Sequence, residues 1–114
     1  MHRDFKLANL LLHDRVCKIA DLGFAKQMKE QDLTETILGT YITMAPEVLE
    51  KRPYGINADI WSLGVVFYQM LTGKYPYKGM TGSDLLKNIK TKQNDLSNLR
   101  ISSLAKNFIQ GCLT

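Results

Sequence analysis

Two carboxylates and one amide near the start of the chain are of the types that form a site for a hard cation. Asp4 and Asn9 precede a short apolar stretch, and Asp21 follows it. Carboxylate and amide oxygens suit Mg²⁺, which usually keeps waters and substrate phosphates as its other ligands. Lys6 lies between the first two, where its ammonium group could neutralise a phosphate. Spacing alone leaves open the alternative that each side chain belongs to a solvated turn.

A β-hairpin is the first element needed to bring these side chains together. The apolar runs at residues 10–12 and 16–20 flank a polar corner at residues 13–15. Two short apolar runs around such a corner predict two antiparallel strands. The hairpin would hold the first carboxylate and the amide on the loop before it and the second carboxylate on the loop after it, so that the three converge.

A helix over residues 58–72 is the second element. Residues 60–71 are apolar on nearly every face, which predicts a buried helix. The stretch is too short to span a bilayer, which takes about 20 apolar residues. Asp59 lies at its start, where a carboxylate suits the positive end of the helix dipole and can accept bonds from backbone amides of a crossing segment.

Two later helices are predicted from hydroxyl side chains that can cap a helix N-terminus. The N-cap of the first would be Thr81 or Ser83, and that of the second Ser102 or Ser103.

Composition limits the class of protein. The 114 residues are 45% hydrophobic and 23% charged, which indicates a globular chain the size of one small domain. The net charge of +4 is scattered along the chain, so we expect no nucleic-acid partner. Cys17 and Cys112 lack metal-ligand spacing and predict free thiols in a reducing compartment. Since no targeting or membrane-inserting segment is visible, we expect a cytoplasmic or nuclear protein.

Four motifs, in order and spacing, resemble the signature of the eukaryotic protein kinases. They are HRDFKLAN at 2–9, DLG at 21–23, GTYITMAPE at 39–47 and DIWSLG at 59–64. The resemblance implies a mainly α fold, a kinase C-terminal lobe with a small β-hairpin at the catalytic loop. It also implies that the carboxylate at the start of the buried helix bonds the backbone of the HRD segment.

Carried over residue by residue, the resemblance gives the polar side chains their roles. Asp4 corresponds to the catalytic base, which orients the substrate hydroxyl and accepts its proton. Asn9 and Asp21 correspond to the Mg²⁺ ligands, and Lys6 to the lysine that meets the γ-phosphate of ATP in serine/threonine kinases. Leu11 falls among the residues that bind the nucleotide. The implied cofactors are therefore ATP and Mg²⁺, and the implied partners are proteins that carry Ser or Thr.

The same resemblance places an activation segment between the DLG and APE motifs. Thr36 falls at the primary activation phosphosite, and Arg3 and Lys26 fall at positions that bind its phosphate. Thr40 resembles the threonine that bonds the catalytic aspartate and lysine in serine/threonine kinases. The alternative for Thr36 is a plain surface hydroxyl. Three residues align with the pocket for the residue after the target Ser/Thr: Ile37, Tyr41 and Met44.

Parts of the kinase signature lie outside this sequence. It contains no glycine-rich phosphate loop, no VAIK-type lysine and no αC glutamate, all of which the family's ATP site needs. We therefore expect a partial protein kinase domain over residues 1–114, without its N-terminal lobe and with an apolar patch left exposed beside the long helix. One reading is a serine/threonine kinase segment, active when completed by that lobe. The other is a catalytically inactive truncated fragment acting as a binding module.

Within the family, two stretches resemble the autophagy-initiating kinase group most closely. They are DLGFAKQM at 21–28 and ETILGTYITMAPEVL at 35–49.

Overall fold

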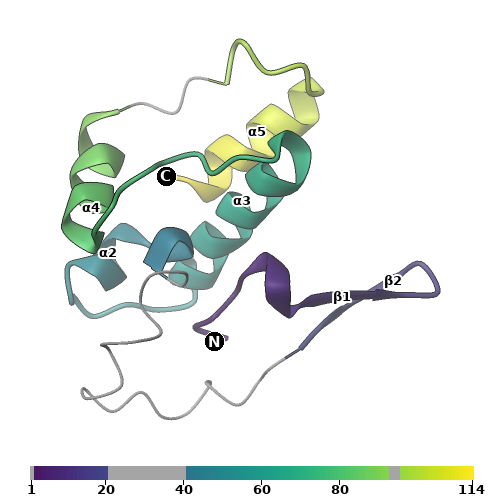
Figure 1. Ribbon diagram of the computed structural model, residues 1–114, viewed down its shortest axis with the longest axis horizontal. Coiled ribbons are helices and arrows are strands. Elements are labelled where there is room, and N and C mark those ends of the chain that lie inside the picture. Colours follow the sequence, from purple (N-terminus) through teal and green to yellow (C-terminus); the bar gives the residue numbers. More distant parts are fainter. Residues whose placement is uncertain (1, 21–40, 93–95) are drawn as a thin grey trace.

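Helix α3 (Asn57–Thr72) is the longest element of the described residues, and it packs along α5 (Ser103–Cys112) (Figure 1). The computed structural model describes residues 2–20, 41–92 and 96–114. Helix α5 lies along one side of α3, and the short 3₁₀ turn η3 (Tyr41–Thr43) contacts α3 as well. The helix ends at Gly73, whose φ of 69° is the left-handed conformation that glycine adopts readily at a helix C-terminus.

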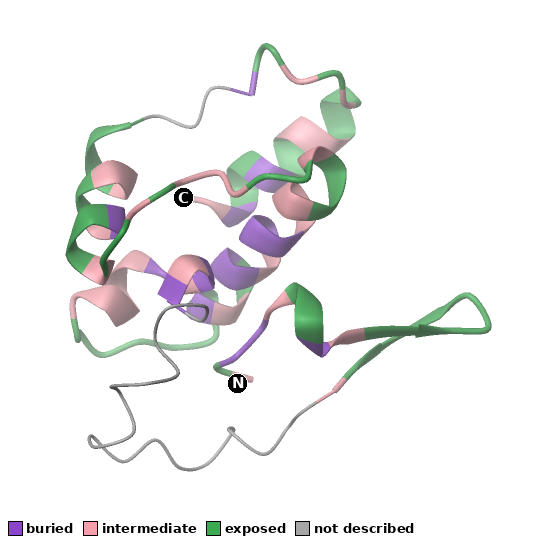
Figure 2. Cartoon of the chain, viewed as in Figure 1, coloured by how far each residue is buried: buried purple, intermediate pink, exposed green. Residues whose placement is uncertain are grey.

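Burial along α3 is one-sided rather than complete (Figure 2). Trp61, Val65 and Val66 are buried, whereas Met70 and Ile60 are 60% and 43% exposed. Since α5 and η3 cover one side of the helix, the expectation that every face is buried is wrong for the described part of the chain. The exposed side agrees with the apolar patch that the sequence predicts beside this helix.

The predicted hairpin is confirmed. Strand β1 (Leu10–His13) pairs antiparallel with β2 (Val16–Ile19), with Leu10 opposite Ile19 and His13 opposite Val16. Asp14 and Arg15 form the connection with φ values of 49° and 63°, as a two-residue turn with positive φ at both positions requires. The strands are largely exposed and extend away from the helices (Figures 1 and 2).

The two predicted N-caps are also confirmed. Helix α4 (Gly82–Thr91) begins after Thr81, whose Oγ1 accepts a hydrogen bond from the Asp84 amide at 3.1 Å. Helix α5 begins after Ser102, whose Oγ accepts from the Ala105 amide at 3.2 Å. Each cap satisfies one of the amides that a helix N-terminus leaves without an intrahelical partner. None of the described helices is long and apolar enough to cross a bilayer.

Helix α2 (Pro46–Leu49) joins α4 to the core. Glu50 at its end forms ion pairs with Arg52 and with Lys90 in the last turn of α4. Hydrogen bonding to the Lys90 ammonium, and then to the Arg52 guanidinium, holds the pKa of the Glu50 carboxyl below its ordinary value. In the core behind α2, the Trp61 ring stacks on Tyr77 with centroids 5.9 Å apart.

Gly64 sets the close approach of α3 to α5. A Cβ at this position would lie 2.5 Å from the Cys112 Cβ and 3.1 Å from the Leu113 Cδ2. We expect Gly64→Ala to destabilise the fold by about 1–2 kcal/mol in urea unfolding, because the overpacking outweighs the better helix propensity of alanine. Gly111→Ala is the matched control: it lies in α5 with nothing within 4 Å of the added carbon, so it should be neutral or stabilising. Equal stability of both variants would contradict this reading of the contact.

Candidate active site

The segment that carries the first predicted site residues is fastened to the start of α3. The Asp59 carboxylate, in the first turn of that helix, accepts hydrogen bonds from the His2 amide at 2.7 Å and from the Arg3 amide at 2.9 Å. The φ of Arg3 is 67°, a left-handed conformation that costs a non-glycine residue about 1–3 kcal/mol. The charge-assisted bonds from Asp59 help to offset that strain, and they confirm that its carboxylate bonds a crossing segment.

The Asp4 carboxylate is the centre of the site. Asp4 and Asn9 are each only 8% exposed. One carboxylate oxygen, Oδ2, is 2.8 Å from the Lys6 Nζ and 3.3 Å from the Asn9 Nδ2. The same Asn9 nitrogen donates to the Asp4 carbonyl oxygen at 2.9 Å. Asp4, Lys6 and Asn9 are therefore brought together by direct contacts.

The other Asp4 oxygen, Oδ1, is buried and has no hydrogen-bond partner in the described part of the chain. A buried polar atom left without a partner costs about 1–3 kcal/mol, so such atoms point to a ligand or a catalytic role. A carboxylate with one oxygen fixed by Lys6 and Asn9 and the other bare can accept a proton from a hydroxyl group.

The donor set also fits Mg²⁺. Because the Asn9 nitrogen is engaged with Asp4, the amide presents its carbonyl oxygen, which is the ligand atom that Mg²⁺ prefers. The second predicted ligand, Asp21, lies outside the described residues. Its neighbour Ala20 is described, and the Ala20 backbone amide donates to the backbone carbonyl oxygen of Asn9 at 2.8 Å, which leaves the side-chain oxygen of Asn9 out of this bond. The end of β2 is thus bonded to the segment that carries Asn9.

Comparison with known proteins identifies the family. The protein kinase domain model matches residues 1–114. The chain belongs to the protein kinase domain family. It is 39% identical over 117 residues to the serine/threonine-protein kinase atg1 of Dictyostelium discoideum, with 99% of this chain and 17% of that protein covered. It is 42% identical over 93 residues to ATG1b of Arabidopsis thaliana, covering 78% of this chain and 13% of the relative.

A third relative, the serine/threonine-protein kinase ppk11 of Schizosaccharomyces pombe, is 38% identical over 116 residues, which cover 99% of this chain and 37% of ppk11. Kinases named ATG1 also match from Kluyveromyces lactis and Komagataella pastoris. These relatives confirm the prediction of a serine/threonine-type kinase segment similar to the autophagy-initiating group. The chain spans 13% to 17% of the length of the first curated relatives it matches. Members of the protein kinase family use ATP and Mg²⁺.

His2 is a site residue of this kinase segment to which sequence reasoning gave no role. Its Nδ1 accepts from the Asp4 amide at 3.4 Å, and its Nε2 lies 3.2 Å from the Ala20 carbonyl oxygen. Since Nδ1 accepts, Nε2 is the nitrogen that donates to the Ala20 carbonyl oxygen. The ring also packs edge-on against Phe5. The sequence signal that could have predicted this role is that His2 is the first residue of the HRD motif.

The predicted substrate pocket and activation segment are described only in part. Tyr41 is buried, and its hydroxyl bonds the carbonyl oxygens of the loop before α4. Met44 is half-buried, Arg3 is exposed beside Asp59, and Leu11 is 55% exposed on β1. Four predicted residues lie outside the described part of the chain: Lys26, Thr36, Ile37 and Thr40. All these site assignments stay predictions.

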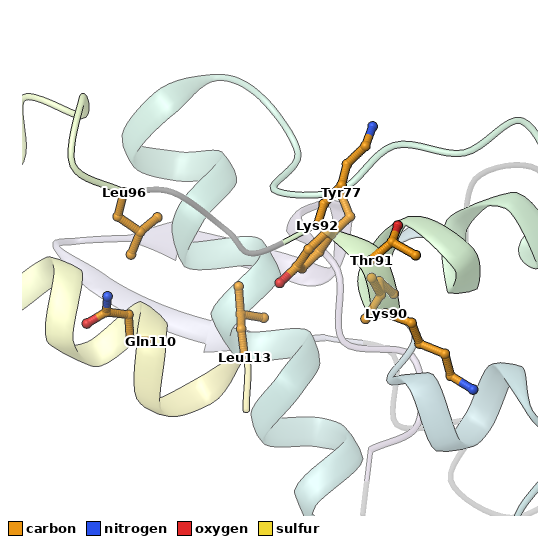
Figure 3. A pocket seen from close by; sticks show the side chains of 8 residues that line it. Tyr77, Lys90, Thr91, Lys92, Leu96, Gln110 and Leu113 are labelled. Carbon is orange, nitrogen blue, oxygen red and sulfur yellow. The ribbon is translucent and has the colours of Figure 1, made fainter.

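A cavity of about 470 Å³ lies between α4 and α5, apart from the kinase motifs (Figure 3). Its walls come from Tyr77, the end of α4, Leu96, Gln110 and Leu113. Burial raises the pKa of the Tyr77 phenol. The Lys90 and Lys92 side chains point away from one another in Figure 3, so their ammonium groups do not converge on one ligand. None of the predicted site residues lines this cavity, and we do not assign the active site to it.

Proposed function

We propose that the protein carrying this chain is a serine/threonine protein kinase that transfers the γ-phosphate of ATP to hydroxyl groups of proteins. The observation that carries the proposal is the buried Asp4 carboxylate, whose Oδ2 is held by Lys6 and Asn9 while Oδ1 has no partner among the described residues. The large majority of buried polar atoms in folded proteins are hydrogen-bonded, so an oxygen without a partner supports a role for Asp4 beyond holding the fold. The family match supports the same reaction.

Asp4 acts as the base in this proposal. A Ser or Thr hydroxyl donates a hydrogen bond to the Asp4 carboxylate, which takes up its proton as the hydroxyl oxygen bonds the γ-phosphorus. The bond from that phosphorus to the oxygen bridging the β- and γ-phosphates breaks, and ADP leaves with the electron pair. Lys6, which is 28% exposed beside Asp4, meets the γ-phosphate and holds the carboxylate in one orientation.

Asn9 and, as predicted, Asp21 would hold Mg²⁺, which when bound offsets the negative charge of the phosphates. Asn9 has a further task that its contacts support: its amide nitrogen fixes the Asp4 side chain and backbone at once. His2 keeps the end of β2 against the segment of Asp4 through its two ring nitrogens.

We further propose that Thr36 is the activation phosphosite and that Arg3 and Lys26 bind its phosphate. We also propose a cytoplasmic or nuclear location for the protein.

The test is phosphate transfer by the intact protein that carries this chain. It would be incubated with Mg²⁺, ATP labelled at the γ-phosphate, and matched peptides that differ only in carrying Ser, Thr or Tyr. Label should appear on the Ser and Thr peptides and not on the Tyr peptide. ATP bound without transfer to any peptide or to the protein itself would favour the binding-module reading instead.

A further inference from the structure

The Tyr41 hydroxyl is turned away from solvent and into the loop before α4. Tyr41 is 6% exposed, and its hydroxyl lies 3.2 Å from the Gly79 carbonyl oxygen and 3.1 Å from the Met80 carbonyl oxygen. A phenol has one proton to donate, so the two carbonyl groups share it. These bonds join positions 38 and 39 residues apart in the sequence. They connect the turn η3, which contains Tyr41 of the predicted substrate pocket, to a separate part of the fold.

The loop that receives this hydroxyl is pressed against α4. A Cβ on Gly79 would lie 2.3 Å from the Leu85 amide nitrogen and 2.6 Å from its Cα. Leu85 itself is fully buried, so it fixes α4 against the rest of the fold. Because the loop has no room to move toward α4, the bond from Tyr41 ties η3 to a rigid partner.

The other end of the same segment has anchors of its own. The Thr43 carbonyl oxygen accepts from the Ser62 hydroxyl at 2.7 Å, and Ala45 is 1% exposed in the core. The Met44 amide donates back to the Tyr41 carbonyl oxygen at 3.0 Å. Met44 is half-buried and lies between Tyr41, whose hydroxyl is bonded to the loop before α4, and Ala45, which is buried in the core.

We infer that Tyr41 is a positioning residue for the protein substrate: its hydroxyl holds residues 41–45 against the loop before α4, and this sets where Met44 of the predicted substrate pocket lies. The inference rests on the proposed kinase function. A phenol already bonded to Gly79 and Met80 acts on the substrate through Met44 rather than by a hydrogen bond of its own. The expected consequence is weaker binding of peptide, not slower chemistry, when the hydroxyl is lost.

The experiment compares Tyr41→Phe with Tyr54→Phe in the intact protein. Tyr54 is 40% exposed and has no hydrogen bond within the described residues, so it controls for the loss of a phenol oxygen. Tyr41→Phe should raise the KM for peptide about three- to tenfold, the range that one neutral hydrogen bond can supply. The KM for ATP and kcat should stay close to those of the wild type, and Tyr54→Phe should change none of them.

Hydrogen exchange supplies a readout that does not depend on activity. Backbone amides of residues 79–85 should exchange faster in Tyr41→Phe than in Tyr54→Phe. An unchanged peptide KM in an active Tyr41→Phe enzyme would overturn the inference and leave the proposed function standing. If Tyr41→Phe lowered kcat and the unfolding temperature and raised the KM for ATP as well as the KM for peptide, the inference would be overturned in favour of a purely structural role. If the wild type transferred no phosphate, the proposed function would fail, while the exchange rates would still show whether the hydroxyl holds the segment.

Discussion

Asp4→Asn in the intact protein is expected to lower kcat for phosphate transfer by about 10²- to 10⁴-fold, the range that a general base contributes. Asparagine has nearly the shape of aspartate and keeps one oxygen for the Lys6 and Asn9 contacts. It cannot take up a proton near neutral pH. The KM for ATP should therefore change little, because the loss lies in the chemical step and not in nucleotide binding. Steady-state kinetics at saturating ATP and peptide measure it.

Asp14→Asn is the matched control for this substitution. Asp14 lies in the hairpin turn, where its side chain is 86% exposed beside His13. The same change of a carboxylate to an amide should leave kcat and both KM values unchanged there. A wild-type kcat in Asp4→Asn would exclude Asp4 as the base. Equal losses in both variants would show that the effect comes from net charge rather than from the site.

Elements that depend on local signals were predictable from the sequence. The hairpin follows from two apolar runs around a polar corner, and the starts of α4 and α5 follow from hydroxyl caps at Thr81 and Ser102. Each of these signals acts within a few residues of the chain, so it needs no knowledge of the tertiary fold. The contact of Asp59 with the backbone of the HRD segment was expected from the resemblance to the protein kinases and not from a local signal, because it joins residues 56 and 57 positions apart.

Contacts between distant parts of the chain were not predictable in the same way. Tyr41 was aligned with the substrate pocket, but the direction of its hydroxyl depends on where the loop at Gly79 passes. His2 reaches Ala20 only because the hairpin turns back on itself. The exposure of Met70 on a helix that is apolar nearly all round shows the same limit: periodicity tells which residues are apolar, and packing partners decide which of them are covered.

Asp59→Asn should loosen the catalytic segment without removing a residue that touches substrate. Aspartate accepts from the His2 and Arg3 amides with separate oxygens, at 2.7 and 2.9 Å. Asparagine keeps one of these bonds and turns an NH₂ group toward the other amide, so that two donors face each other. Hydrogen bonds to a charged group contribute about 1.5–3 kcal/mol each, and we expect a loss of about 2–3 kcal/mol. The His2 and Arg3 amides should exchange about 30- to 150-fold faster, and kcat should fall because Asp4 follows directly in the chain.

Asp84→Asn separates this bridging effect from a simple helix-dipole effect. Asp84 also lies in the first turn of a helix, α4, and its amide is already capped by Thr81. Removing its charge should cost only about 0.3–1 kcal/mol, the usual value of a carboxylate at a helix N-terminus. If both variants lost the same small amount and the His2 and Arg3 amides stayed protected, Asp59 would act through the dipole alone. A larger loss confined to Asp59→Asn, with fast exchange at those amides, would mean that the carboxylate holds the strained backbone at Arg3 and thereby the orientation of Asp4.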